Sequence, residues 1–267
     1  EPVAIHGYSP SLGIPSVKDA IAENLNERFG MAYTGNHIFP TTGAAGALAH
    51  ALRVVTKPGD EVITFAPYFP EYQPYVNGTG AHLTVVPADT ENFQINFEAF
   101  EEMLTEKVKA VLINTPNNPS GVVYSTPTLQ RLADILSEKS KEYGHIIYLI
   151  SDEPYREIVF EGVDSPCVSY FYDNTIMCYS FSKSLSLPGE RIGYLVIPDE
   201  LEDSATVITA AAIANRVLGS VNAPSLMQKV IQKCVDAEVD VAAYDRNRLA
   251  LYNGLKECGF ECIKPQG

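Results

Sequence analysis

The strongest constraint on the fold is a series of seven short apolar runs, each followed by a turn or by a stretch of helical length. Most of the runs do not alternate apolar with polar residues, which is typical of strands covered by helices on both faces. The sequence therefore predicts an α/β fold with a mostly parallel sheet flanked by helices. The runs are His37 to Thr41, Glu61 to Phe65, Ala81 to Val86, Ala110 to Ile113, Ile146 to Ile150, Thr175 to Tyr179 and Gly193 to Ile197.

Helical patterns precede and follow these runs. A first helix is expected from about Pro15, with Gly30 as its stop, and crossover helices are expected in 46–56 and 128–143. Beyond about Pro198 the pattern is helical, in 205–217, 224–237 and 240–258. We expect residues 1–200 to form a large domain, with about 1–30 leading into it and 201–240 completing it. Residues 241–267 would begin a smaller C-terminal α/β domain.

Composition excludes several classes of function. The net charge is -14 and no run is rich in Lys or Arg, so nucleic acid is not an expected partner. No apolar stretch approaches the roughly 20 residues that span a bilayer, so no membrane association is expected. The five cysteines form no Cys-x-x-Cys pair and the five histidines show no metal spacing. They indicate reduced thiols of a cytoplasmic protein and no metal site.

Ligands of open α/β sheets bind at the carboxyl ends of the strands, so polar segments after the apolar runs are the candidates. After the first run, 41–48 is a stretch of small residues that could open a helix and bring backbone N–H groups to a phosphate. Close packing alone would also explain it. The sequence lacks a Gly-Lys-Ser/Thr ending to this segment, which disfavours a P-loop NTPase. Residues 114–121 contain two prolines around an Asn pair, which either form an ordinary turn or hold an amide rigidly.

Two later segments carry ionisable groups. Asp152 follows an apolar run; acids in that place commonly cap a helix, but a buried one facing a cationic ring nitrogen would keep that nitrogen protonated. Lys183 lies among small hydroxylic residues with little other charge nearby, which suits a reactive amine better than a solvated surface lysine. Arg191 then offers a planar fork for a phosphate.

Six motifs together resemble the class I/II aminotransferases of pyridoxal-phosphate fold type I, the aspartate aminotransferase superfamily. They occur in the family's order, and Lys183 and Arg191 have the family's separation. The resemblance implies an enzyme that moves an amino group between an L-amino acid and a 2-oxo acid, with pyridoxal 5′-phosphate as cofactor. The motifs are 8–15, the loop at Gly43, 67–72, 114–121, 152–155 and 180–191.

The resemblance also implies roles for single residues. Lys183 would form the internal aldimine and then shuttle a proton between the substrate Cα and the cofactor's C4′. Asp152 would pair with the pyridinium nitrogen and keep the ring an electron sink. Asn118 and Tyr155 would hydrogen-bond the phenolic oxygen of the ring, and Phe69 would stack on its face. Lys183, Asp152 and Tyr155 are thus the expected catalytic residues.

The phosphate of the cofactor would be held by backbone groups of the Gly43 loop and by side chains of the segment 180–191. Tyr8 matches a family tyrosine that reaches the phosphate of the neighbouring subunit, so the resemblance implies a homodimer with shared active sites. The family's arginine for the substrate carboxylate would lie beyond Gly267 and an N-terminal arm before Glu1, so both ends are expected to be cut. The phosphate-binding residues would be Gly43, Ala44, Ala45, Ser180 and Arg191.

Three other functions are compatible with parts of the sequence. A carbon–sulfur lyase of the same fold would use the same cofactor residues, although 188–193 looks closer to the transaminases. A non-catalytic domain that senses pyridoxal phosphate or an amino acid would need a DNA-binding segment upstream of Glu1. A phosphate-binding α/β protein without pyridoxal leaves the joint presence of Asp152, Lys183 and Arg191 unexplained.

Overall fold

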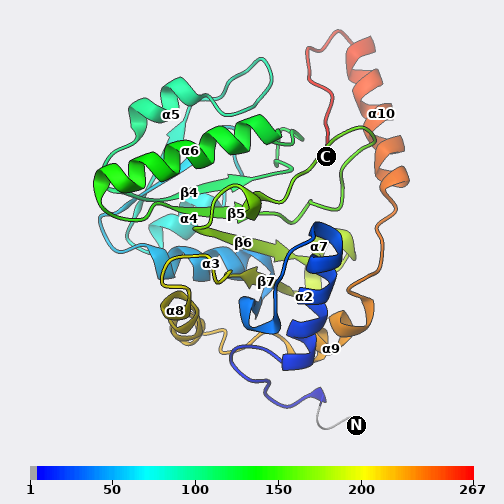
Figure 1. The fold of residues 1–267 in the computed structure, drawn as a ribbon. Helices are drawn as coiled ribbons and strands as arrows, with labels where there is room; N and C mark the ends of the chain where they lie inside the picture. The colour runs from blue at the N-terminus through cyan, green and yellow to red at the C-terminus, as the bar shows by residue number, and fades with distance from the viewer. Residues whose placement is uncertain (1–4) are drawn as a thin grey trace.

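The computed structural model describes residues 5–267 and contains a single seven-stranded sheet (Figure 1). The strand order is β1-β7-β6-β5-β4-β2-β3. β7 is antiparallel to both of its neighbours and every other neighbouring pair is parallel, which confirms the predicted mostly parallel α/β fold. The strands are β1 (Ile38–Thr41), β2 (Glu61–Phe65), β3 (His82–Val86), β4 (Val108–Asn114), β5 (Tyr148–Asp152), β6 (Thr175–Ser180) and β7 (Gly193–Val196).

All seven predicted runs are strands, but three of them extend further than their apolar residues. β4, β5 and β6 end on Asn114, Asp152 and Ser180, and Asn114 still pairs with Asp152 across the sheet. Pairing with a neighbouring strand continues the hydrogen-bond ladder through polar residues, which an apolar run does not reveal. The polar side chains are therefore fixed by the sheet itself and not by the loops that follow.

The helices follow the predicted pattern closely. α2 begins with Pro15, whose ring fits the first turn, and ends where Gly30 adopts a left-handed φ of 65°. The Ser125 hydroxyl accepts a hydrogen bond from the Thr128 N–H and so caps α6. The helices are α2 (Pro15–Phe29), α3 (Gly43–Val55), α4 (Tyr72–Asn77), α5 (Phe97–Met103), α6 (Thr126–Tyr143), α7 (Phe181–Ser184), α8 (Ser204–Val217), α9 (Ser225–Cys234) and α10 (Val241–Glu257).

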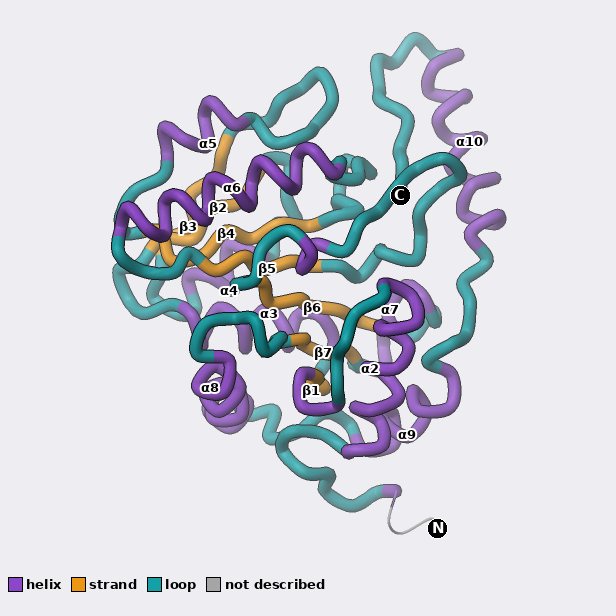
Figure 2. Tube along the Cα trace, in the orientation of Figure 1, coloured by secondary structure: helices purple, strands orange, loops and turns teal. Residues whose placement is uncertain are grey.

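The helices cover both faces of the sheet (Figure 2). Along β6, Ile176 and Cys178 pack into the core beneath α3 and α8, whereas Met177 and Tyr179 pack on the opposite face with α2 and α9. α5 and α6 cover that opposite face over the β2, β4 and β5 strands. Side chains alternate between the two faces, so apolar residues at consecutive positions are all buried.

The C-terminal part is different. α10 contains no buried residue and lies apart from the sheet (Figure 1). The chain then returns, and the Gln266 N–H donates to the Gly121 carbonyl at 2.6 Å while the Phe160 N–H donates to the Gln266 carbonyl at 2.9 Å. The division into domains at 200 and 240 stays a prediction, and residues 1–4 of the predicted leading segment 1–30 lie outside the described residues. Within residues 5–267 no helix is long and apolar enough to cross a membrane.

Candidate active site

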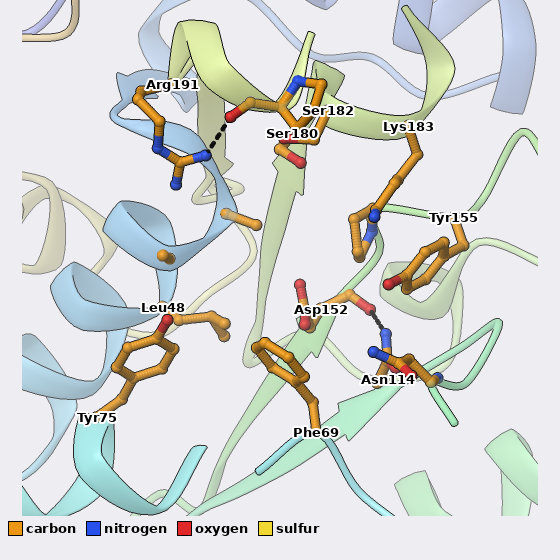
Figure 3. Close-up of a pocket in the computed structure, with 15 residues that line it drawn as sticks. Leu48, Phe69, Tyr75, Asn114, Asp152, Tyr155, Ser180, Ser182, Lys183 and Arg191 are labelled. Atoms are coloured by element: carbon orange, nitrogen blue, oxygen red, sulfur yellow. Dashed lines mark hydrogen bonds between the residues drawn. The ribbon is translucent and has the colours of Figure 1, made fainter. Parts of the chain in front are cut away.

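The polar residues that follow the strands meet at one edge of the sheet. Because β7 reverses direction on both sides, the carboxyl ends of β1, β4, β5 and β6 all lie at this edge. They surround a cavity of about 330 Å³ (Figure 3). The cavity is lined by Ala44, Ala45, Leu48, Phe69, Tyr75, Asn114, Asn118, Asp152, Pro154, Tyr155, Ser180, Ser182, Lys183, Pro188 and Arg191. All predicted site residues except Gly43 and Tyr8 are therefore brought together.

Gly43 lies directly behind the cavity wall. It begins α3 with a φ of 78°, and a Cβ at this position would come within 3.0 Å of the Arg191 Nη2 atom. Gly193 packs against the Gly43 backbone, where a Cβ would come within 2.9 Å of the Gly43 carbonyl carbon. Both glycines allow the start of α3 to approach β7 and Arg191 more closely than a side chain would permit.

Asp152 forms the floor of the cavity. Its Oδ2 atom accepts a hydrogen bond of 2.7 Å from the Tyr72 hydroxyl, whereas its Oδ1 atom is buried and has no hydrogen-bond partner within residues 5–267. Burial raises the pKa of Asp152 to about 7, the nearby Glu153 charge adds to the increase, and the Tyr72 hydrogen bond opposes it. A buried carboxyl with one unpaired oxygen is costly unless a cation or donor completes it.

Two asparagines fix the loop beside Asp152. The Asn114 side-chain amide donates to the Asp152 carbonyl at 2.8 Å, and its oxygen accepts the Asn118 N–H at 2.7 Å. Asn118 in turn forms a hydrogen bond with the Tyr155 side chain. Burial raises the pKa of Tyr155, the Asp152 charge acts in the same direction, and the Asn118 contact opposes it. The Tyr155 phenol is therefore a proton donor at neutral pH.

Sequence reasoning did not assign Tyr72 and Asn114 a role. The sequence does draw attention to both residues, because Asn114 directly follows the apolar residues of β4 and Tyr72 ends the aromatic motif 67–72. Neither signal shows that the Tyr72 hydroxyl reaches Asp152 at the end of β5.

Lys183 lies in α7, the short helix that follows β6 directly. Its side chain extends into the cavity toward Tyr155, with the Nζ atom 5.5 Å from the centre of the Tyr155 ring (Figure 3). A hydrogen bond of 2.7 Å between the Ser184 and Tyr179 hydroxyls holds α7 against the sheet. The amine thus borders the same cavity as the buried Asp152 carboxyl.

Arg191 borders the other end of the cavity. It has a left-handed φ of 53°, and its Nη1 atom donates to the Pro188 carbonyl at 2.7 Å. The guanidinium faces the first turn of α3, where Ala44 and Ala45 line the cavity. A helix start, a guanidinium and the hydroxyls of Ser180 and Ser182 together suit a phosphate group.

Tyr8 lies outside the cavity and is 93% exposed. Within residues 5–267 no cluster of three or more His, Cys, Asp or Glu side chains suits a metal ion. The cavity therefore combines an amine, a buried acid, a phenol and a guanidinium at one edge of the sheet.

The sequence profile of the family described as "Aminotransferase class I and II" matches residues 2–267. The chain belongs to this family. Amino-group transfer is accordingly its reaction class. An aspartate aminotransferase of Thermotoga maritima is 31% identical over 97% of this chain and 67% of its own length. A probable aspartate/prephenate aminotransferase of Thermus aquaticus is 30% identical over 97% of this chain and 67% of its own length.

A solved structure agrees with the arrangement of this aminotransferase chain. The crystal structure of an amino transferase from Eubacterium rectale is 51% identical and superposes with a TM-score of 0.98. The superposition covers 100% of this chain and 67% of the Eubacterium rectale chain. The chain thus spans about two thirds of the length of these proteins.

Proposed function

We propose that this aminotransferase chain uses pyridoxal 5′-phosphate to move an amino group between an L-amino acid and a 2-oxo acid, with Lys183 as the residue that binds the cofactor covalently. The observation that carries the proposal is the Asp152 Oδ1 atom, buried at the floor of the cavity without a partner within residues 5–267. A protonated ring nitrogen supplies the missing donor and positive charge. A carboxyl with a pKa near 7 in the free protein becomes a stable carboxylate beside such a cation.

The remaining residues fit the other groups of the cofactor. Asn118 and Tyr155, which are hydrogen-bonded to each other, would hold the phenolic oxygen, and Phe69 would pack on the ring beside Asp152. The phosphate would lie at the opposite end of the cavity from Tyr155. There it would be held by Gly43, Ala44, Ala45, Ser180 and Arg191.

When bound, pyridoxal phosphate supplies an electron sink that makes the substrate Cα proton acidic. Lys183 Nζ would take that proton, since it is the amine that projects into the cavity. Asp152 keeps a proton on the ring nitrogen through its charge, and Tyr72 holds the Asp152 carboxyl in place. Asn114 and Asn118 keep the loop at the sheet edge from moving away from the site.

We also propose that two copies of this chain form a dimer in which Tyr8 reaches the partner's phosphate site. Tyr8 is 93% exposed although the segment beside it is anchored: the Asn222 and Gln228 amides donate to the Ser9 hydroxyl at 2.7 and 3.0 Å. Such anchoring holds an aromatic side chain in solvent, which is unfavourable unless a partner covers it. Large apolar residues are also exposed on α8 and around α9: Ile213, Val217, Leu218, Val221, Leu226 and Val230.

Mixed dimers test the sharing of sites. Tyr8→Phe is expected to lower the affinity of the homodimer for pyridoxal phosphate. A mixed dimer of one Tyr8→Phe subunit and one Lys183→Ala subunit would contain one site that lacks both the Tyr8 hydroxyl and the Lys183 amine, and one site that has both. That dimer is expected to keep about half of the wild-type activity. Sedimentation as a monomer at assay concentration would contradict the proposal.

A cytoplasmic location stays a prediction, supported by the five cysteines, all of which are free thiols.

The reaction itself is tested by adding pyridoxal phosphate to the purified protein and recording its visible spectrum before and after a panel of amino acids. Transamination predicts a cofactor band that each good substrate converts to the pyridoxamine form, with one 2-oxo acid released per site. Release of ammonia and pyruvate would instead show the lyase reaction. Cofactor binding without any turnover would favour a sensing domain.

A further inference from the structure

α4 contributes two tyrosines to the surroundings of the cavity, and only one of them has a role so far. Tyr72 donates its hydrogen bond to Asp152. Tyr75 lies three residues further along the helix, on the same face, and also lines the cavity. Tyr72 thus acts on the cavity through Asp152, whereas Tyr75 borders the cavity directly and needs its own explanation.

Tyr75 lies at the anion-binding end of the cavity. In Figure 3 it is on the side of Arg191 and Leu48, whereas Lys183 and Tyr155 lie on the other side. Its ring packs against the core cluster beneath α3. Its position is thus fixed by packing, while the phenol lines the same space as Ala44 and Ala45 at the start of α3.

The charges around Tyr75 make it a donor. Burial raises its pKa, the Glu71 and Asp152 charges act in the same direction, and the positive charge of Arg191 opposes them. No side-chain hydrogen bond within residues 5–267 contributes to this balance. A neutral phenol that lines the same cavity as a guanidinium and a helix start suits an anion that accepts hydrogen bonds from all three.

We propose that Tyr75 is a further cofactor-binding residue, whose hydroxyl donates a hydrogen bond to the phosphate of pyridoxal phosphate in its own subunit, alongside Arg191 and the first turn of α3. This inference rests on the proposed function, since it takes pyridoxal phosphate as the ligand. It assigns the phosphate a donor from α4, so the helix that holds Asp152 through Tyr72 also holds the other end of the cofactor.

The test compares apo wild type with Tyr75→Phe, and with Tyr68→Phe as a matched control. Tyr68 stacks on Tyr72 at 6.3 Å between ring centres but does not line this cavity. Each protein is titrated with pyridoxal phosphate and with pyridoxal, which lacks the phosphate. The shift of apo thermal unfolding by inorganic phosphate is measured separately and needs no bound cofactor.

Loss of one hydrogen bond to a charged group predicts about 5–20-fold weaker binding of pyridoxal phosphate by Tyr75→Phe. Binding of pyridoxal should not change, the phosphate-induced shift should shrink, and Tyr68→Phe should match wild type. Equal weakening for both ligands, or unchanged affinity for pyridoxal phosphate, would overturn the inference alone. Wild-type protein that binds no pyridoxal phosphate would instead overturn the proposed function.

Discussion

The floor and the rim of the cavity are built in different ways. On the floor, Asp152 and Asn114 are buried strand residues held by the sheet ladder and by side-chain hydrogen bonds. On the rim, Lys183 and Arg191 come from a four-residue helix and a left-handed turn, and Arg191 is exposed. The floor therefore sets a fixed electrostatic environment at a cost in stability. The rim would supply the groups that bind or release a ligand, as proposed above, without disturbing the core.

Lys183→Ala should give the largest loss of activity with the smallest change in fold. Removal of the covalent attachment and of the proton-transfer amine is expected to lower kcat by roughly 10³-fold or more. Thermal unfolding of the apo protein should stay within about 2 °C of wild type, because the rim contributes little to the core. Single-turnover rates and apo melting curves measure both effects. A large drop in the melting temperature of the apo variant would contradict the claim that the rim contributes little to the stability of the core.

Asp152→Asn should reduce activity and stabilise the apo protein. The pKa of Asp152 is about 7 in the folded chain, against 3.8 ordinarily. Ionisation of Asp152 therefore leaves the stability of the fold unchanged below about pH 4 and lowers it progressively as pH rises to 7. Asn has no charge to bury, and the apo variant is expected to gain on the order of 2 kcal/mol over wild type at pH 8. Denaturant unfolding from pH 4 to 8 measures this, and a gain that does not grow with pH would contradict the account.

Gly43→Ala should act at the junction of rim and core. The new Cβ would meet Arg191 in a backbone conformation with φ of 78°, so we expect a loss of about 1–2 kcal/mol in unfolding free energy. Affinity for pyridoxal phosphate should also fall. Gly59→Ala is the matched control, because Gly59 has a φ of 92° but no atom within 4 Å of the added Cβ. Equal affinity in both variants would mean that backbone strain, and not contact with Arg191, explains the effect.

Tyr72→Phe should have the smallest effect of the four on the cofactor site. It removes the donor to Asp152 Oδ2, which costs about 1–2 kcal/mol and raises the pKa of Asp152 further. The acid limb of the pH profile for cofactor binding should therefore move to higher pH. An unchanged profile would show that Tyr72 does not influence the charge of Asp152.

The sequence predicts the fold better than the details of the floor. Apolar runs identify all seven strands, because most strand residues are buried beneath helices on one face or the other. The runs end too early at Asn114 and Asp152, since the ladder continues through polar residues that are hydrogen-bonded to each other. Rim residues are found from motifs, whereas Tyr72 and Tyr75 depend on where α4 crosses the sheet edge, which no local pattern encodes.

The attachment of the cofactor to Lys183 is the central claim, and it can be tested directly. The protein would be incubated with pyridoxal phosphate, reduced with borohydride, digested and analysed by peptide mass spectrometry. The account predicts that the added mass lies on the peptide containing Lys183, at one per chain, and disappears when an amino acid substrate is added before reduction. Stoichiometric labelling of another lysine, or transamination by the Lys183→Ala variant at the wild-type rate, would contradict it.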